Sequence, residues 1–280
     1  MISIVLGGKF IDFLKNRQLK ESIRDDGPKT HLSKQGTPTM GGVFIVVSVI
    51  IASLLWINLS IMYVWFVLLF TISFAAIGFW DDSMKMKKGR GMSARVKFLI
   101  QIILGVALVM MLVSDGKGFT MSLRLNEISS YSSTSVLLPF FKKAVIDLGP
   151  LYIVFAVVVI VGSSNAVNLT DGLDGLAIGS IAVVVGTYLV FSYLSGNIIF
   201  ARYLQIPYIA GSGELAVFLA AVGGACLGFL WYNSHPAQVF MGDVGSLALG
   251  AAIGSVAVVI KQEILLVIVG GLFVAEVLSV

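Results

Sequence analysis

The stretch Ile61–Asp82 reads IMYVWFVLLFTISFAAIGFWDD. Its segment 61–80 contains no charged side chain, and two aspartates follow it at once. A helix needs about 20 apolar residues to cross the hydrocarbon core of a membrane. We therefore predict a membrane-spanning helix over 61–80 that ends at a pair of carboxylates.

The same apolar pattern recurs along the rest of the chain. Of its 280 residues, 58% are hydrophobic and only 12% are charged, whereas soluble domains have about 25% charged residues. Further spans are predicted at 41–58, 97–114, 150–165, 174–194, 213–232, 244–260 and 264–280. The composition excludes a water-soluble protein. It predicts an all-α polytopic membrane protein, with one integral-membrane domain over 1–280 built as a helical bundle of about eight to nine spans.

Basic residues are divided unequally between the two sides of this bundle. One side has Lys15, Arg17, Lys20, Arg24, Lys29, Lys34, Lys85, Lys87, Lys88, Arg90, Arg95 and Lys97. The other has only Lys117, Arg124, Lys142, Lys143, Arg202 and Lys261. Cytoplasmic loops are enriched in Lys and Arg, so segments 15–40, 81–96, 166–173 and 233–243 are predicted to face the cytoplasm. Membrane topology thus accounts for the net charge of +4, and no nucleic-acid partner is expected.

The longest loop on the other side, 115–149, contains a strand-like pattern. Phe119, Met121, Leu123 and Leu125 alternate with polar or charged residues. A period of two is typical of a β-strand. We expect a short strand or hairpin here, with no catalytic role.

Three acidic motifs fall on the predicted cytoplasmic side. They are Asp81 and Asp82, then Asp171 and Asp174 in NLTDGLDG (168–175), and Asp243 in FMGDVGS (240–246). A charge at the bilayer centre costs roughly 2.5–3.5 kcal/mol on insertion scales, so these carboxylates are expected at helix ends, where they line a hydrated cleft. Because Mg²⁺ prefers one or two carboxylates together with phosphate oxygens, the motifs predict a hard-cation site.

Each acidic residue also has an ordinary interpretation. Asp243 could be the N-cap of the helix that begins near Val244. Asp174 could be a turn residue beside Gly175. Asp81 and Asp82 could be solvated charges at the membrane border.

The first basic loop adds a candidate phosphate site. Lys34 is followed by the small-residue stretch Gly36–Gly42, GTPTMGG. Small residues allow the backbone to approach a ligand closely, and a helix N-terminus favours anions. The alternatives are that Thr39 is a helix cap and that Lys85 and Lys97 serve only as topology signals.

Taken together, these motifs resemble one membrane enzyme family. The matching stretches are DDGP (25–28), His31, Lys34, GTPTMGG (36–42), Asp81-Asp82, NLTDGLDG (168–175) and NSHPAQVFMGD (233–243). They are similar to the phospho-MurNAc-pentapeptide translocases. The aspartate motifs are shared with the wider polyprenyl-phosphate hexose-1-phosphate transferases, whereas the Gly36–Gly42 stretch singles out the translocases.

The resemblance implies an activity, a cofactor and a location. The expected reaction is the transfer of phospho-MurNAc-pentapeptide from its UDP carrier to undecaprenyl phosphate, giving lipid I and UMP in peptidoglycan synthesis. It implies a Mg²⁺-dependent, multi-pass enzyme of the bacterial cytoplasmic (inner) membrane, in contact with membrane lipids, with ten spans in the family. A homodimer is one assembly that the sequence allows.

The resemblance also implies roles for individual residues. Asp243 is the expected Mg²⁺ ligand, and Asp81 and Asp82 orient the lipid phosphate or remove its proton. The phosphate monoester titrates near pH ~6, about 2 units above an unperturbed Asp, which favours orientation over base catalysis. The expected nucleotide contacts are Asn168, Asp171, Asn233 and Phe240, with Phe240 a candidate for stacking on uracil. The expected phosphate contacts are Lys34, Thr39, Lys85 and Lys97, and Asp174 is a further expected substrate contact.

Two other functions are compatible with these features. One is a sister transferase that uses UDP-GlcNAc, against which the Gly36–Gly42 stretch argues. The other is a transporter or flippase for an anionic solute, which would place polar groups near the bilayer midplane. Here Glu276 is the main acidic residue inside an apolar segment.

Both ends of the chain differ from the family pattern. Residues 1–14 resemble the remainder of the family's first helix, and the chain ends at Val280, before the family's histidine-rich loop and last helix. We therefore expect a truncated chain with impaired activity.

Overall fold

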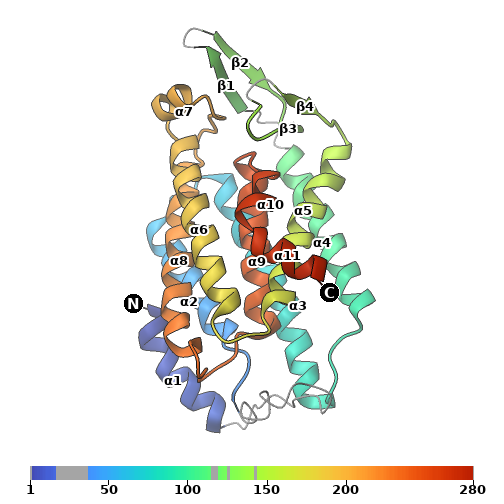
Figure 1. The fold of residues 1–280 in the computed structure, drawn as a ribbon, viewed down its shortest axis with the longest axis vertical. Helices are drawn as coiled ribbons and strands as arrows, with labels where there is room; N and C mark the ends of the chain where they lie inside the picture. The colour runs from blue at the N-terminus through green and yellow to red at the C-terminus, as the bar shows by residue number, and fades with distance from the viewer. Residues whose placement is uncertain (1, 17–36, 115–118, 125–126, 142–143, 280) are drawn as a thin grey trace.

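A computed structural model describes residues 2–16, 37–114, 119–124, 127–141 and 144–279 (Figure 1). The described helices are α1 (Ile2–Asn16), α2 (Gly42–Trp56), α3 (Met62–Lys88), α4 (Ala94–Ser114), α5 (Leu151–Thr170), α6 (Leu176–Ser195), α7 (Ile198–Leu204), α8 (Gly213–Asn233), α9 (Gly242–Val259), α10 (Leu265–Val269) and α11 (Gly271–Ser279). Six of them, α3, α4, α5, α6, α8 and α9, are long and apolar enough to cross a membrane, and α2 is a shorter apolar helix. The predicted all-α polytopic membrane class is confirmed.

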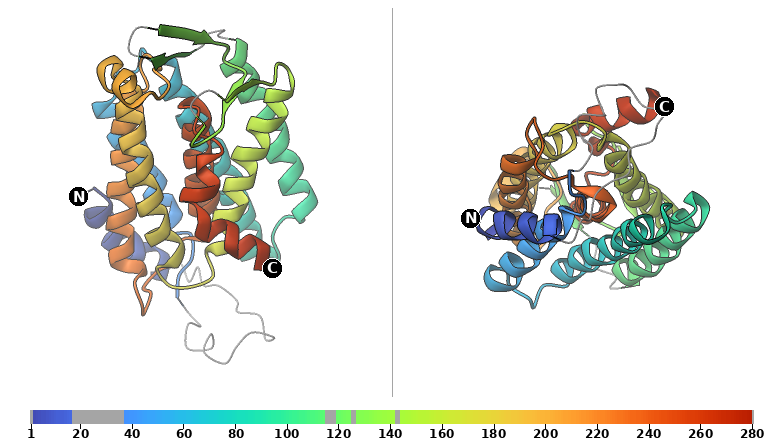
Figure 2. Two further views of the ribbon diagram at one scale, coloured as in Figure 1. Left: turned by 45° about the horizontal axis from the view of Figure 1, so that its top comes forward. Right: turned by 90° about the horizontal axis from the view of Figure 1, so that it is seen from below.

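Helix α9 forms the centre of the bundle, and every residue from Asp243 to Val259 is buried. Helices α2, α3, α5 and α6 pack around it (Figure 2). Small residues make this packing close, as is common between membrane helices. A Cβ atom on Gly78 of α3 would lie 2.2 Å from the carbonyl oxygen of Asp243, and one on Gly250 of α9 would lie 2.6 Å from that of Ser163 in α5. Larger residues would therefore push α3 and α5 away from α9.

Helix α3 extends beyond the predicted span 61–80. It ends at Lys88 and is terminated by Gly89 in the left-handed conformation, with φ of 70°. The prediction that this helix ends at the carboxylate pair is therefore wrong, because Asp81, Asp82 and Lys85 all lie within α3. The sequence after Trp80 contains Met and Lys, which favour helix, so the helix continues until a residue that tolerates a positive φ.

The predicted span 264–280 is not one helix. It is divided into α10 and α11 at Gly270 and Gly271, since two glycines in succession weaken a helix. Helix α11 turns away from α10 and packs against α5 (Figure 1). The predicted spans 41–58, 97–114, 150–165, 174–194, 213–232 and 244–260 correspond to α2, α4, α5, α6, α8 and α9, with boundary shifts.

The loop predicted to contain a hairpin contains two. Strands β1 (Phe119–Arg124) and β2 (Glu127–Tyr131) pair antiparallel, with Phe119 opposite Tyr131. Strands β3 (Ser135–Leu137) and β4 (Val145–Asp147) also pair antiparallel, with Val136 opposite Ile146. Figure 1 shows both hairpins at one end of the bundle, whereas the C-terminus of α3 and the N-terminus of α9 lie at the opposite end.

Candidate active site

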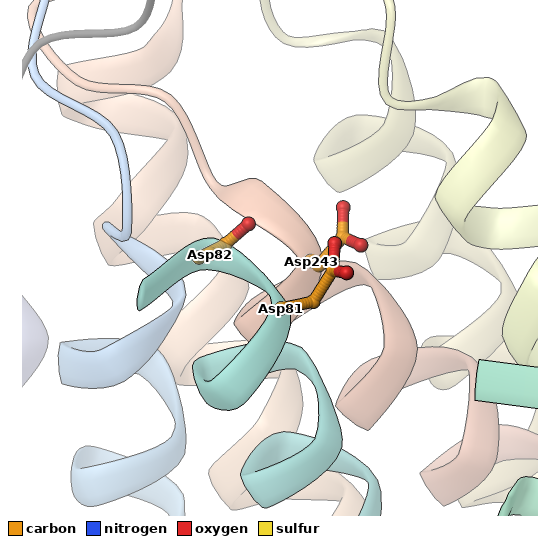
Figure 3. A group of neighbouring side chains, drawn as sticks. All are labelled: Asp81, Asp82 and Asp243. Carbon is orange, nitrogen blue, oxygen red and sulfur yellow. The ribbon is translucent and has the colours of Figure 1, made fainter. Parts of the chain in front are cut away.

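Three carboxylates meet where α3 ends and α9 begins. Asp81, Asp82 and Asp243 each offer an oxygen atom, and these atoms lie within 4.8 Å of one another. Figure 3 shows Asp81 and Asp243 close together, with Asp82 on the side of the segment that leads into α2. We call these three residues the carboxylate cluster. In the described part of the chain, it is the group of three or more His, Cys, Asp or Glu residues that could hold a metal ion.

Two lysines neutralise part of this negative charge. Lys85 Nζ lies 2.8 Å from Asp81 Oδ2, 3.3 Å from Asp82 Oδ1 and 3.1 Å from Asp243 Oδ1. Lys97 Nζ, from α4, lies 2.7 Å from Asp243 Oδ2 and 3.6 Å from Asp81 Oδ2. The Lys85 side chain is 45% exposed, whereas that of Lys97 is 17% exposed. Lys85 is therefore the more accessible of the two cluster lysines.

Backbone amides fix the two carboxylates of α3. Met92 N–H donates to Asp81 Oδ1 at 2.6 Å, and Val244 N–H donates to Asp82 Oδ2 at 3.3 Å. Glycines make room for this arrangement. A Cβ atom on Gly91 would lie 2.6 Å from Asp81 Oδ1, and one on Gly242, whose φ is 73°, would lie 2.6 Å from Asp82 Oδ2.

Asp243 is not the cap of α9. The N-cap position is Met241, and no side chain caps the helix there. The Asp243 carboxylate instead accepts from Lys97 at 2.7 Å and from Asn168 Nδ2 at 3.0 Å. Asn168 also donates to Ser246 Oγ at 2.7 Å. The structure thus brings Asn168, Lys85 and Lys97 to the carboxylate cluster, while their binding roles stay predictions.

A divalent cation fits the chemistry of this cluster. Asp81 is 1% exposed, and its Oδ2 atom has no aligned hydrogen-bond donor, although the Lys85 ammonium lies 2.8 Å away. A buried carboxylate oxygen without a hydrogen bond is costly unless another positive group satisfies it. Carboxylate oxygens are also the ligands that hard cations prefer. The cluster therefore can bind either a cation at its oxygens or a phosphate at its lysines.

A second polar group connects α6 and α8. Asn233, 4% exposed, accepts from Gly175 N at 3.0 Å and donates to Val239 O at 2.9 Å. Asp174 lies 3.2 Å from His235 Nδ1 and accepts from Ala237 N at 3.3 Å. Asn233 therefore holds two loops together in this structure. The nucleotide contact expected of Asn233 and the substrate contact expected of Asp174 stay predictions.

Thr39 lies beside the carboxylate cluster and is buried. It is not a helix cap, because the N-cap of α2 is Gly41 and has no side-chain hydrogen bond. A Cβ atom on Gly242 would lie 3.2 Å from Thr39 Oγ1. The segment around Thr39 is joined to Phe240, whose backbone N–H donates to Pro38 O at 2.9 Å and whose carbonyl accepts from Gly41 N at 2.8 Å.

Three other predicted contacts have different outcomes. The Phe240 side chain is half-buried, which leaves its predicted stacking on uracil untested. Asp171 follows the last residue of α5 and is half-buried. Lys34 lies outside the described residues.

A buried amide pair lies below this site and was not predicted from the sequence. Asn165 Nδ2 donates to Gln101 Oε1 at 2.7 Å, and Gln101 is fully buried. Gln101 lies one helical turn from Lys97, and Asn165 lies one turn from Asn168. The pair therefore joins α4 to α5 where both helices supply partners of Asp243. Polar residues inside a predicted span were the available signal, since such residues are rare and face the bundle interior.

Comparisons with known proteins identify the family of the chain. Residues 64–261 match the family described as Glycosyl transferase family 4, and residues 34–46 match the phospho-N-acetylmuramoyl-pentapeptide-transferase signature 1. A phospho-N-acetylmuramoyl-pentapeptide-transferase of Desulfotalea psychrophila is 52% identical over 282 residues, which cover 100% of this chain and 75% of the relative.

Two further relatives have the same name. The protein of Geobacter sp. strain M21 is 50% identical, with 100% of this chain and 75% of the relative covered. The protein of Thermodesulfovibrio yellowstonii is 50% identical, with 99% of this chain and 74% of the relative covered. By its motifs and by these similarities, the chain belongs to the phospho-N-acetylmuramoyl-pentapeptide-transferase family.

Proposed function

We propose that this chain transfers phospho-MurNAc-pentapeptide from UDP-MurNAc-pentapeptide to undecaprenyl phosphate, giving lipid I and UMP. The observation that supports this most is the 52% identity to a protein named for that transfer, extending over the whole of this chain. The carboxylate cluster with its two lysines is where we place the reaction. One substrate is a soluble anion and the other has an apolar tail, so a polar site at the end of a lipid-facing bundle suits both.

The reaction is a phosphoryl transfer, in which positioning and charge neutralisation provide most of the catalysis. Lys85 and Lys97 would bind phosphate oxygens once these replace the carboxylates as their partners. Asp81 and Asp82 would orient the phosphate of the acceptor, whose nucleophilic oxygen is already ionised at neutral pH because its second proton titrates near ~6.

We further propose that the three carboxylates hold Mg²⁺. Asp243 is the principal ligand, with Asp81 and Asp82 beside it. When bound, the ion supplies Lewis-acid neutralisation of the diphosphate charge. Asn168 keeps the Asp243 carboxylate oriented through its 3.0 Å hydrogen bond.

The decisive experiment compares two donors. The purified chain is incubated with undecaprenyl phosphate, Mg²⁺ and radiolabelled UDP-MurNAc-pentapeptide or UDP-GlcNAc, and lipid-linked label and UMP are measured. We expect label transfer from UDP-MurNAc-pentapeptide alone. Transfer from UDP-GlcNAc alone would assign the chain to the sister reaction.

We also propose that the site faces the cytoplasm, as the distribution of basic residues favours. Cysteines introduced at the exposed residues Arg90 and Ser234 should react with an impermeant reagent only from the cytoplasmic side. A cysteine at Tyr203, which is 79% exposed in α7, should react from the other side. The native Cys226 is buried and gives little background. Labelling of Arg90→Cys from outside would contradict this orientation.

A further inference from the structure

Residues of helices α2 and α3 near the carboxylate cluster line an open apolar groove of about 680 Å³. Val47 of α2 and Ala76 and Trp80 of α3 belong to its walls, and Val244 of α9 belongs to its floor. Lys87 and Lys88 lie at the end of α3 and also line it. We call this feature the α2–α3 groove. It differs from the cluster in being almost entirely apolar.

The two features use different faces of α3. Gly78, Asp81 and Asp82 face α9, since Gly78 approaches the Asp243 backbone and Asp82 accepts from Val244 N. Trp80 and Lys87 face the groove instead, and the Trp80 side chain is 66% exposed. Residues on different faces of one helix do not share a ligand atom easily. Lys88, which follows Lys85 by one helical turn, also lines the groove. A phosphate held by Lys87 as well as Lys88 is therefore displaced from a reacting phosphate at Lys85 toward the groove face of α3.

The charge at the rim of the groove is positive. Lys87 and Lys88 are exposed, and no ion pair with a described carboxylate involves either of them. Lys85 and Lys97, in contrast, are both bound to the cluster. Lysines next to the hydrocarbon region extend their ammonium groups toward lipid headgroups. A Trp near them is typical of the membrane interface.

The length of the groove matches one leaflet. Its α3 wall runs from Ala75 to Lys88, which at ~1.5 Å per residue is about 20 Å. One half of the ~30 Å hydrocarbon core is about 15 Å. An acyl chain of one leaflet therefore fits along the apolar wall while its headgroup reaches the lysines.

We propose that the α2–α3 groove binds an anionic glycerophospholipid, with an acyl chain between α2 and α3 and the phosphate at Lys87 and Lys88. This is a lipid site separate from the acceptor site of the transfer reaction. Its floor, Val244, is the residue whose N–H donates to Asp82, so occupancy of the groove supports the backbone that orients one carboxylate of the cluster.

The test measures lipid contact at Trp80 as quenching of its fluorescence by brominated lipid. The chain contains four Trp residues, and Trp56→Phe, Trp65→Phe and Trp231→Phe leave Trp80 as the fluorophore. The protein in mixed micelles is titrated with brominated phosphatidylglycerol or brominated phosphatidylcholine. We expect half-maximal quenching by phosphatidylglycerol at a roughly tenfold lower lipid fraction than by phosphatidylcholine. The reason is that each Lys near the headgroup strengthens the binding of an anionic lipid. Equal quenching by both lipids would overturn the proposal.

Two controls locate the effect. Lys87→Gln with Lys88→Gln should abolish the preference for phosphatidylglycerol, whereas Arg90→Gln with Arg95→Gln, which removes the same charge outside the groove, should retain it. A variant with Trp231 as the only Trp, 71% exposed on α8, should be quenched equally by both lipids. If the two double variants behave alike, the lysines are not the site and the proposal fails.

A last arm separates the phospholipid from the acceptor. Undecaprenyl phosphate added at equal concentration should leave the quenching by brominated phosphatidylglycerol unchanged. Displacement at that concentration would assign the groove to the acceptor tail and overturn the proposal. Because these experiments measure contact rather than turnover, their result is independent of whether the proposed transfer reaction is found.

Discussion

The central helix α9 has a buried group of charges at each end, and the two groups are built differently. At its N-terminus, three carboxylates share two lysines. At its C-terminus, Lys261 and Glu263 lie 4.0 Å apart and are 5% and 2% exposed. Both groups are in the bundle, yet only the first has more carboxylates than lysines.

Lys261 and Glu263, the group at the C-terminus of α9, form hydrogen bonds with uncharged partners. Tyr152 OH donates to Glu263 Oε1 at 2.7 Å, and Lys261 Nζ donates to Tyr152 OH at 2.6 Å and to the carbonyl of Ser133. Tyr188 OH donates to Gln262 O at 2.8 Å. These bonds connect α5, α6, the turn after α9 and the loop before β3. We infer that this group fastens the end of the bundle.

The difference between the groups indicates which one binds ligands. The carboxylate cluster has three carboxylates against two lysines, so a cation would complete its charge balance, and the Lys85 side chain is 45% exposed. The balanced Lys261–Glu263 pair has no excess charge and no exposed member. A buried pair of this kind is costly to break but adds little net stability. The cluster should therefore determine activity and the pair should determine stability.

The largest expected effect is that of Asp243→Asn. The substitution removes one charge with little change of shape, and it removes an acceptor of Lys97 and a ligand for the proposed Mg²⁺. We expect transfer to fall by roughly 10²–10³-fold, the size of effect seen when one electrostatic contact to a transition state is removed. Initial rates of UMP release over a range of Mg²⁺ concentrations measure it. Near-normal turnover with an unchanged Mg²⁺ dependence would contradict the proposed role.

The opposite result is expected for Glu263→Gln. Removing one member of a buried pair costs roughly 3–5 kcal/mol because the other charge is left without compensation. Thermal unfolding in detergent should therefore occur at a clearly lower temperature, while transfer below that temperature remains close to that of the parent. The double variant Lys261→Met with Glu263→Leu should recover most of the stability. A loss of transfer at full stability would show that the two ends of α9 do not have separate roles.

A smaller effect is expected for Gln101→Leu, which removes the acceptor of Asn165 below the carboxylate cluster. The amide pair holds α4, and with it Lys97, against α5. Loss of such indirect support reduces metal affinity or activity by roughly 10–100-fold at metal sites, and we expect the lower end of that range. In a double-mutant cycle with Lys97→Gln, the two effects should not add, because both act through one contact. Strictly additive effects would mean that Gln101 is only a packing residue.

The sequence predicts the cluster better than the pair for a physical reason. The ends of apolar runs contain Asp81, Asp82 and Asp243, and a charge is stable there only beside water. Because successive spans alternate in direction, all three are predicted on one side of the membrane. The same reasoning does not identify Glu263 or Gln101. Their partners Tyr152 and Asn165 are distant in sequence, and only the packing of α5 on its neighbours brings them into contact.

The fold shows the same contrast. Hydropathy predicts the long spans, because each needs a run of apolar residues. It does not predict that α3 continues to Lys88 or that 264–280 is divided at Gly270. Those boundaries depend on glycine conformation and on contacts with other helices. Hydropathy carries no information about either.

The smallest expected effect is a pH dependence of stability that originates at Lys261. Burial is the main cause that lowers the pKa of Lys261 from 10.5 to about 8, against the opposing attraction of Glu263. Between these two values the unfolded chain binds the proton and the folded chain has released it, so the unfolding free energy rises with pH in this window. A single group gives at most about 1.4 kcal/mol per pH unit.

Unfolding temperatures measured in detergent between pH ~8 and ~9.5 should therefore increase for the parent, below the range near ~10 in which exposed tyrosines ionise. Lys261→Met should remove most of this slope, whereas Lys88→Met, the matched loss of an exposed lysine, should retain it. An equal slope in all three proteins would mean that Lys261 keeps its proton in the folded state. The group at the C-terminus of α9 would then be a charged ion pair like those of the carboxylate cluster, and the contrast between the two ends would rest on exposure alone.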